Sequence, residues 1–142
     1  MCIRDSSDEA PGVEGLGILK GEILRIPDKE GYKIPHMGWN SLHLENDGRL
    51  FKGIAENSYV YFVHSYYLKA EEEQIVKAST EYATHIHASV EKENIFACQF
   101  HPEKSSDAGA RLLANFATIA RAARADSAHA DKVAKNPVAS KE

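Results

Sequence analysis

The segment from Tyr59 to Tyr67, YVYFVHSYY, is an almost unbroken run of aromatic and β-branched residues. Residues of these types are enriched in strands, and a run without polar alternation is typical of a strand that is covered on both faces. Such a strand needs a layer of secondary structure on each side. The run therefore predicts a layered architecture, with helices or a second sheet packed against a central sheet.

Shorter segments on both sides of this run predict further strands and one helix. Residues 17–26 alternate apolar and polar side chains until Pro27, which predicts a strand. Residues 73–80 and 85–100 predict three more short strands, with a hairpin turn at 91–94. From Ser105 to about Arg124, apolar residues recur at three- and four-residue spacing, which predicts an amphipathic helix capped by Ser105 or Ser106.

The two ends of the chain carry no such patterns. The first sixteen residues are interpreted as a loop, and within them residues 1–6 (MCIRDS) as a foreign segment. Residues 125–142 are rich in Ala, Lys and Ser, which predicts a disordered tail. Because one helix cannot cover both faces of a sheet, we expect residues 7–124 to be the C-terminal part of a larger α/β domain.

Length and charge limit the classes of function. A chain of 142 residues with a net charge of −4 predicts one domain without a basic stripe, which argues against nucleic-acid binding. No apolar run is long enough to span a membrane, and two cysteines are too few for a disulfide framework. We therefore expect a soluble, cytoplasmic protein.

The segment NIFACQFHPEKSS places a histidine and a glutamate around a proline, directly after an apolar strand. Proline fixes its own φ and favours extended geometry in the residue before it, so His101 and Glu103 are expected to point to the same side. A carboxylate beside an imidazole selects the tautomer and orients the ring. The pattern predicts the base and its orienting partner in a nucleophilic triad.

QFHPEKS, together with PHMGWN and YVYFVHSYY upstream, resembles the triad-type (class I) glutamine amidotransferases. Within them the chain is similar to the glutaminase subunits of imidazole glycerol phosphate synthase, from about Ser7 to Phe116. The resemblance implies an α/β fold with a central, mostly parallel sheet and flanking helices. It also implies hydrolysis of glutamine to glutamate and ammonia, without a cofactor, and transfer of the ammonia to a cyclase subunit in a heterodimer.

The resemblance implies a role for several residues of this chain. His101 would be the general base and then the acid, and Glu103 would orient it. Glu9 would bind the α-amino group of the substrate, and backbone groups of Ser65 and Tyr66 its α-carboxylate. Trp39 would lie on the face that contacts the cyclase subunit, and Lys104 matches a lysine of the family that forms an ion pair with that subunit.

The triad also needs a cysteine on a sharp Gly-x-Cys-x-Gly turn, and neither cysteine of this chain stands in that context. Cys2 lacks flanking glycines, and Cys98 is interpreted as a small apolar residue within a strand. By the resemblance the nucleophile precedes Met1, so we expect the chain to lack the N-terminal strands and the nucleophile turn of the family and to be inactive alone.

Other interpretations remain open at this point. The chain could be the glutaminase of another amidotransferase, or a non-catalytic module that docks on a cyclase subunit. His85 and His87 share a strand face, but no third metal ligand is obvious nearby, so a solvated face is preferred to a metal site. His64 is interpreted as a hydrogen-bonded core histidine.

Overall fold

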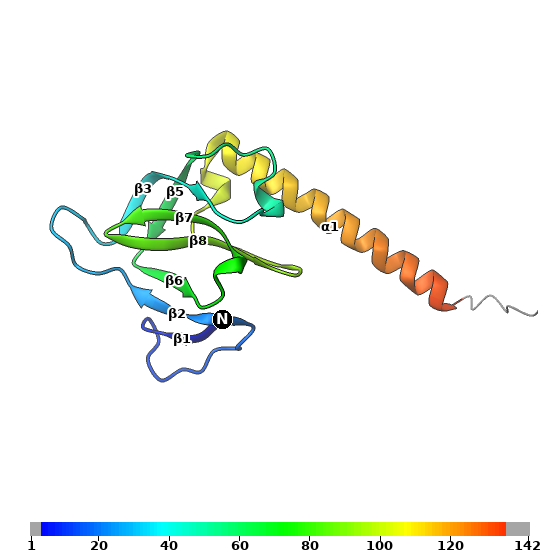
Figure 1. Ribbon diagram of the computed structural model, residues 1–142, viewed down its shortest axis with the longest axis horizontal. Helices are drawn as coiled ribbons and strands as arrows, with labels where there is room; N and C mark the ends of the chain where they lie inside the picture. The colour runs from blue at the N-terminus through cyan, green and yellow to red at the C-terminus, as the bar shows by residue number, and fades with distance from the viewer. Residues whose placement is uncertain (1–3, 136–142) are drawn as a thin grey trace, which may run out of the picture.

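The computed structural model describes residues 4–135, and its main sheet has seven strands. Strands β1 (Arg4–Ser7), β2 (Leu19–Arg25), β6 (Tyr66–Ala70), β8 (Thr84–Lys92), β7 (Val76–Tyr82) and β4 (His43–Leu44) follow one another across this sheet, and β9 (Ile95–Cys98) also pairs with β8. A second sheet consists of β3 (His36–Ser41) and β5 (Tyr59–His64) (Figure 1). Short 3-10 helices span Arg49–Phe51, Glu73–Ile75 and Pro102–Lys104.

The strand directions differ from the expected mostly parallel sheet. Of the pairs in the described residues, β1 with β2 is parallel and the others are antiparallel. For two of the pairs the reason is local, because β7, β8 and β9 follow one another through tight turns, and a short connection can join only antiparallel strands. The other antiparallel pairs join strands that are not consecutive in the chain. The turn at Glu93, where φ is 55°, confirms the expected hairpin.

The long aromatic run divides into two strands of different sheets. Strand β5 ends at His64 and β6 begins at Tyr66, so the chain changes sheet at Ser65. The carbonyl oxygen of Ser65 accepts a hydrogen bond from the backbone N–H of Ile26 at 2.9 Å, which fixes the corner. Strand β5 alternates buried and more exposed side chains, so the expectation of one strand covered on both faces was wrong.

Both ends of the chain contain more regular structure than expected. Residues 4–7 form β1 beside β2 rather than a loop, although the loop prediction holds for residues 8–16. Helix α1 runs from Ser106 to Lys135, so it continues past Arg124 into the stretch that we expected to be a disordered tail. Alanine favours helix, which explains the extension. Residues 1–3, with Cys2, and 136–142 lie outside the described residues.

The core next to the candidate site joins both sheets to the start of α1. Its buried side chains are Leu42, Leu50, Phe51, Val60, Phe62, Ala78, Ala88, Phe100 and Leu112. Leu112 is the fully buried contribution of α1, Ala108 and Ile119 pack against the same core, and the C-terminal part of the helix extends away from the sheets (Figure 1). No helix in residues 4–135 is long and apolar enough to cross a membrane.

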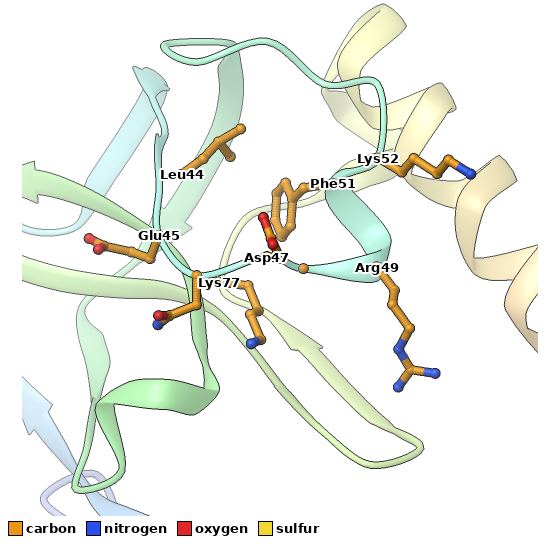
Figure 2. Close-up of a pocket in the computed structure, with 9 residues that line it drawn as sticks. Leu44, Glu45, Asp47, Arg49, Phe51, Lys52 and Lys77 are labelled. Atoms are coloured by element: carbon orange, nitrogen blue, oxygen red, sulfur yellow. The ribbon is translucent and has the colours of Figure 1, made fainter.

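The connection after β4 ties α1 to the sheets. It forms an open hollow of about 360 Å³ beside β7, lined by Leu44, Phe51, Lys77 and neighbouring polar and charged residues (Figure 2). The amide of Asn115 on α1 donates to the carbonyl oxygens of Leu50 at 2.7 Å and Lys52 at 2.8 Å. These bonds hold the first turns of α1 in place.

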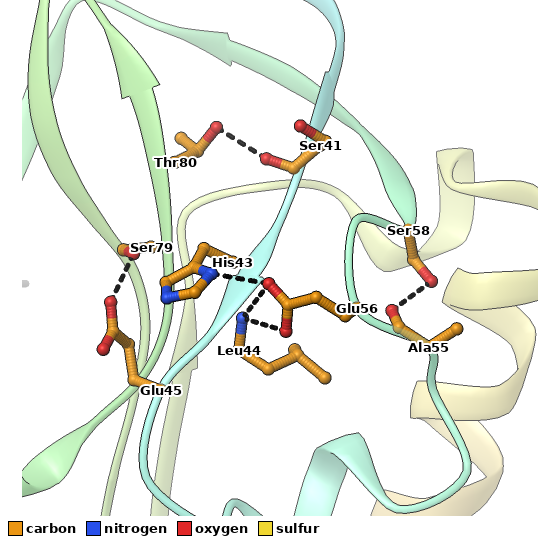
Figure 3. Close-up of polar contacts among 9 residues, drawn as sticks. All are labelled: Ser41, His43, Leu44, Glu45, Ala55, Glu56, Ser58, Ser79 and Thr80. Carbon is orange, nitrogen blue, oxygen red and sulfur yellow. Dashed lines mark hydrogen bonds and ion pairs between the residues drawn. The ribbon is translucent and has the colours of Figure 1, made fainter.

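Side-chain hydrogen bonds also hold β4 in position (Figure 3). The carboxylate of Glu56 accepts from the backbone N–H of Leu44 at 3.0 Å and pairs with the ring of His43. On the other side, the Ser79 hydroxyl donates to Glu45 at 2.6 Å. The edge of the sheet that lies beside the second sheet is therefore fixed by contacts that are far apart in sequence.

Candidate active site

The structure brings His101 and Glu103 together as the sequence predicts. Nδ1 of His101 lies 2.8 Å from Oε1 of Glu103, across the short turn that begins at Pro102. A carboxylate only accepts hydrogen bonds, so Nδ1 carries a proton, and in the neutral ring Nε2 then has the free lone pair. A hydrogen bond from its own backbone N–H, and then that from His101, lowers the pKa of Glu103, which keeps the carboxylate ionised. The pair is a base with its orienting group.

Strand β5 and the start of α1 hold this turn in place. The backbone N–H of His101 donates to the carbonyl oxygen of Tyr61 at 2.9 Å, and the buried side chain of Phe100 anchors the preceding residue in the core. The Ser105 side chain is completely buried. Its hydroxyl donates to the His101 carbonyl at 2.6 Å and accepts from the Tyr61 N–H at 3.0 Å.

Ser105 therefore has a role that the sequence did not indicate. Its carbonyl accepts the first hydrogen bond of α1, from Gly109 at 3.0 Å, which is the backbone part of an N-cap. Its hydroxyl, however, joins the His101 turn to β5 instead of capping the helix. The only signal in the sequence is the serine itself, because its two partners depend on the tertiary fold.

Gly109 allows α1 to approach the Pro102 turn closely. A Cβ at this position would lie 1.8 Å from the Pro102 carbonyl oxygen and 2.9 Å from Cβ of Ser105. No flexible side chain can give way at the shorter contact, because it is made by backbone. A glycine at this helix position is therefore required by packing.

Gly109→Ala is expected to lower the free energy of unfolding by about 1–3 kcal/mol, because the added methyl group overpacks the turn. Helix propensity alone predicts the opposite sign, a gain of about 1 kcal/mol. Urea unfolding of both chains checks this. The control is Ala110→Gly at the next, exposed position, which should cost about 1 kcal/mol from propensity alone. A Gly109→Ala chain that is more stable than the original would contradict the close approach.

The other expected substrate residues gather at one end of β2. Glu9 is exposed and follows Asp8, whose carboxylate accepts the backbone N–H of Arg25 at 3.3 Å. Arg25 is the register partner of Tyr66, and Ser65 bonds to the next residue of the chain, Ile26. Glu9 and the Ser65–Tyr66 corner therefore lie near the same sheet end. They are connected to His101 through β5, and within residues 4–135 no hydrogen bond or ion pair joins Glu9, Ser65 or Tyr66 to His101 or Glu103.

Trp39 and Lys104 both lie beside the ring of Tyr61. The ring centroids of Trp39 and Tyr61 are 6.1 Å apart at 75°, and Nζ of Lys104 lies 5.8 Å from the Tyr61 centroid. Trp39 is 53% exposed, and Met37 and Tyr59 beside it are 62% and 61% exposed. The two-stranded sheet therefore presents an apolar face next to the His101 turn.

Cys98 has the properties of a structural thiol. It ends β9, where its sulfur lies 3.6 Å from the Ser89 hydroxyl. Burial raises the pKa of the thiol to about 11, so it stays protonated at neutral pH and is a poor nucleophile.

The histidines at positions 64, 85 and 87 bond within the protein. His85 pairs with Glu81, and Nδ1 of His87 accepts the Ala70 N–H at 3.0 Å. Burial, with the charge of His85, lowers the pKa of His87. In residues 4–135 no group of three or more His, Cys, Asp and Glu side chains is placed to hold a metal ion. His64 is buried and hydrogen-bonded, as predicted for a core histidine.

A family model described as glutamine amidotransferase class-I matches residues 17–120. The chain belongs to the class-I glutamine amidotransferase family. The match includes the His101–Glu103 pair, both sheets apart from β1, and the first half of α1.

Two curated relatives are named imidazole glycerol phosphate synthase subunit HisH. The one from Methanocaldococcus jannaschii is 46% identical over 84% of this chain and 59% of its own length. The one from Methanothermobacter thermautotrophicus is 49% identical over 86% of this chain and 60% of its own length. The chain thus spans about 60% of the length of these amidotransferase relatives.

The fold is similar to that of a Thermoplasma acidophilum protein of known crystal structure, which is assigned to GMP synthase. The TM-score is 0.61 at 19% identity, with 75% of this chain and 52% of that chain covered. At this identity the likeness concerns the amidotransferase fold only.

Proposed function

We propose that the chain carries the base half of a glutaminase site, in the glutaminase subunit of imidazole glycerol phosphate synthase. The observation that carries this proposal is the His101–Glu103 pair, with Nδ1 bonded to the carboxylate at 2.8 Å. Membership in the amidotransferase family and the names of the relatives support the reaction and the partner.

The geometry of the pair is suited to amide hydrolysis through a thioester. Nε2 of His101 takes the proton of a cysteine thiol, and the thiolate attacks the side-chain amide carbon of glutamine. The imidazolium, stabilised by Glu103, then gives the proton to the departing nitrogen, which leaves as ammonia. His101 next takes a proton from water as the water attacks the thioester, which releases glutamate and restores the thiol.

The sheet end near Glu9 would hold the other end of the substrate. The carboxylate of Glu9 is exposed and can pair with the α-ammonium group of glutamine. The Ser65–Tyr66 corner offers backbone groups for the α-carboxylate. Glutamine would then extend along β5, with its amide toward His101.

The apolar face around Trp39 would contact the cyclase subunit. Its exposed side chains are Met37, Trp39 and Tyr59, with Lys104 at the border. Tryptophan is frequent among the residues that contribute most to binding. An interface here would place the source of ammonia, beside His101, close to the subunit that consumes it.

The 142-residue chain by itself is expected to release no ammonia from glutamine above background. Neither cysteine stands on a Gly-x-Cys-x-Gly turn, and the Cys98 thiol stays protonated. An ammonia assay with and without a cyclase subunit checks this. Ammonia release that is abolished by Cys98→Ser would show that Cys98 is the nucleophile. It would refute the proposal that this chain carries only the base and its orienting carboxylate.

Binding to a cyclase subunit tests the proposed partner. We expect the chain to bind the cyclase subunit of an imidazole glycerol phosphate synthase in calorimetry, and Trp39→Ala to weaken binding at least tenfold. Tyr32→Ala, a similarly exposed aromatic residue outside that face, is the control. Tighter binding to the synthase subunit of another amidotransferase would assign the chain to that enzyme. If a nucleophile is supplied and the chain still binds the cyclase subunit but releases no ammonia, the chain is a docking module.

A further inference from the structure

Two buried histidines that have no role in the proposed mechanism are bonded to each other. His36 begins β3 and His64 ends β5, and the two residues are register partners. Nδ1 of His36 lies 2.9 Å from Nε2 of His64, and the side chains are 3% and 7% exposed. A buried imidazole pair costs free energy unless every nitrogen has a partner, so the partners at both ends are informative.

The end of the pair at His64 fixes the direction of the hydrogen bonds. Nδ1 of His64 lies 2.9 Å from the carbonyl oxygen of Tyr66. A carbonyl only accepts, so Nδ1 of His64 carries a hydrogen. Burial lowers the pKa of both rings, so both are neutral at pH 7 and Nε2 of His64 accepts. Nδ1 of His36 must then donate to it.

The other end of the pair agrees with this direction. Oδ1 of Asn40 accepts the backbone N–H of Ser41 at 2.8 Å, which identifies Nδ2 as the opposite atom of the amide. Nδ2 donates to the Glu81 carbonyl at 3.0 Å and lies 3.5 Å from Nε2 of His36. Hydrogen bonds therefore run one way, from Asn40 through His36 and His64 to the Tyr66 carbonyl.

Aromatic rings prevent His36 from turning. Its ring stacks on Tyr82, with centroids 3.8 Å apart at 13°, and on Phe62, at 4.7 Å and 19°. Tyr82 is held in turn by its hydroxyl, which donates to the Lys33 carbonyl at 2.7 Å. The donor that His36 offers to His64 therefore has a fixed direction.

The last bond of the series fixes the backbone at the corner between the sheets. The peptide plane before Tyr66 is set by the bond from Ile26 to the Ser65 carbonyl, and the plane after it by the bond from His64. A trans peptide points its N–H opposite to its C=O, so the bond at the Ser65 carbonyl sets the direction of the Tyr66 N–H, and the bond from His64 sets that of the Tyr67 N–H. By the antiparallel register the Tyr67 N–H faces Leu24 of β2, and the Tyr66 N–H points away from β2. A carboxylate accepts hydrogen bonds and donates none, so the α-carboxylate of glutamine needs an N–H that points toward it.

We propose that Asn40, His36 and His64 are positioning residues, which hold the Tyr66 backbone in the orientation that the α-carboxylate of glutamine requires. This inference rests on the proposed glutaminase function. None of the three side chains needs to touch the substrate. They act through the Tyr66 carbonyl, whose hydrogen bond from His64 fixes the peptide plane after Tyr66, while the bond from Ile26 to the Ser65 carbonyl fixes the plane before it.

Imidazole nitrogen NMR on the intact chain tests the series directly. At pH 7 we expect His36 and His64 to be neutral and both protonated at Nδ1. An Nε2–H tautomer or a positive charge on either ring would overturn the proposal. This measurement needs no substitution, so it remains decisive even where a variant fails to fold.

Substitutions at His64 test the positioning. His64→Phe keeps an aromatic ring but removes the donor, and His64→Asn places an amide donor where Nδ1 stands. Titration with L-glutamine, followed at the Ser65, Tyr66 and Tyr67 amide signals, should give a dissociation constant at least tenfold weaker for His64→Phe, with recovery in His64→Asn. Equal binding by His64→Phe and the original chain would overturn the proposal.

The same titration separates this inference from the proposed function. If both rings have the Nδ1–H tautomer but L-glutamine shifts none of the three amides, the assignment of this corner to the substrate fails, and the positioning role fails with it. If L-glutamine shifts the amides but the tautomers differ, only the hydrogen-bond series fails. The two failures therefore have different signatures.

Discussion

His101→Ala is expected to lower glutaminase turnover by on the order of a million-fold, which is the scale seen when the base of a comparable triad is removed. The assay uses a chimera, in which a Gly-x-Cys-x-Gly segment of a relative is joined to this chain and supplies the nucleophilic cysteine. Without Nε2 of His101, no group takes the thiol proton or protonates the departing nitrogen. The quantity to measure is kcat for ammonia release at saturating glutamine.

Glu103→Ala is expected to cost less, on the order of ten-thousand-fold, because the base remains and only its tautomer and orientation are lost. The carboxylate acts through Nδ1, where it is bonded at 2.8 Å. Glu103→Gln keeps the size of the side chain but can present its amide to Nδ1, so it should be as slow as Glu103→Ala.

The molecule provides a matched control for both substitutions. His85 is also an exposed histidine paired with a glutamate, Glu81, and its side chain is 51% exposed against 39% for His101. His85→Ala should leave kcat within about twofold, since exposed ion pairs contribute little. A His101→Ala enzyme that retains a tenth of the turnover would show that another group is the base.

The site could be predicted from the sequence where its geometry is local. His101 and Glu103 are two residues apart, and Pro102 between them fixes the backbone, so their contact needs no tertiary information. The same holds for β2, where alternation sets the faces, and for the hairpin turn at Glu93. In each case the chemistry of a few neighbouring residues determines the structure.

The rest of the site depends on contacts between distant residues. The break at Ser65 has no glycine or proline to mark it, and it is fixed by a hydrogen bond from Ile26. Ser105 bonds to Tyr61, which is 44 residues away. The length of α1 was missed for a different reason, because a polar, alanine-rich segment suits both a disordered tail and an exposed helix.

The free energy of unfolding is expected to fall by about 3 kcal/mol between pH 7 and pH 4 through His36 alone. Burial, and then the neighbouring His64, lowers the pKa of His36 from 6.5 to about 4. Between these two values the unfolded chain binds a proton at this site that the folded chain does not bind. Stability from His36 is therefore complete above pH 6.5 and is lost as the pH falls toward 4.

Urea unfolding of the original chain and of His36→Phe, at several pH values from 7 to 4, isolates this contribution. Phenylalanine keeps the stack between Tyr82 and Phe62 but cannot titrate, and it leaves Nε2 of His64 without its donor. His36→Phe should be less stable at pH 7, by about 1–3 kcal/mol for the unsatisfied nitrogen. Its stability should then fall less steeply with acid, so that the two curves converge near pH 4.

His43→Phe is the control for this measurement, because the His43 side chain is 66% exposed and lies outside the buried pair. Its unfolding curve shows how much of the change comes from replacing any histidine by phenylalanine. The pKa of His64 is also lowered, mainly by burial, so part of the slope should remain in His36→Phe and disappear only when both rings are replaced. Parallel curves for the original chain and His36→Phe would mean that His36 is protonated equally in the folded and unfolded states, so that burial would not be what keeps the ring neutral in the series that ends at Tyr66.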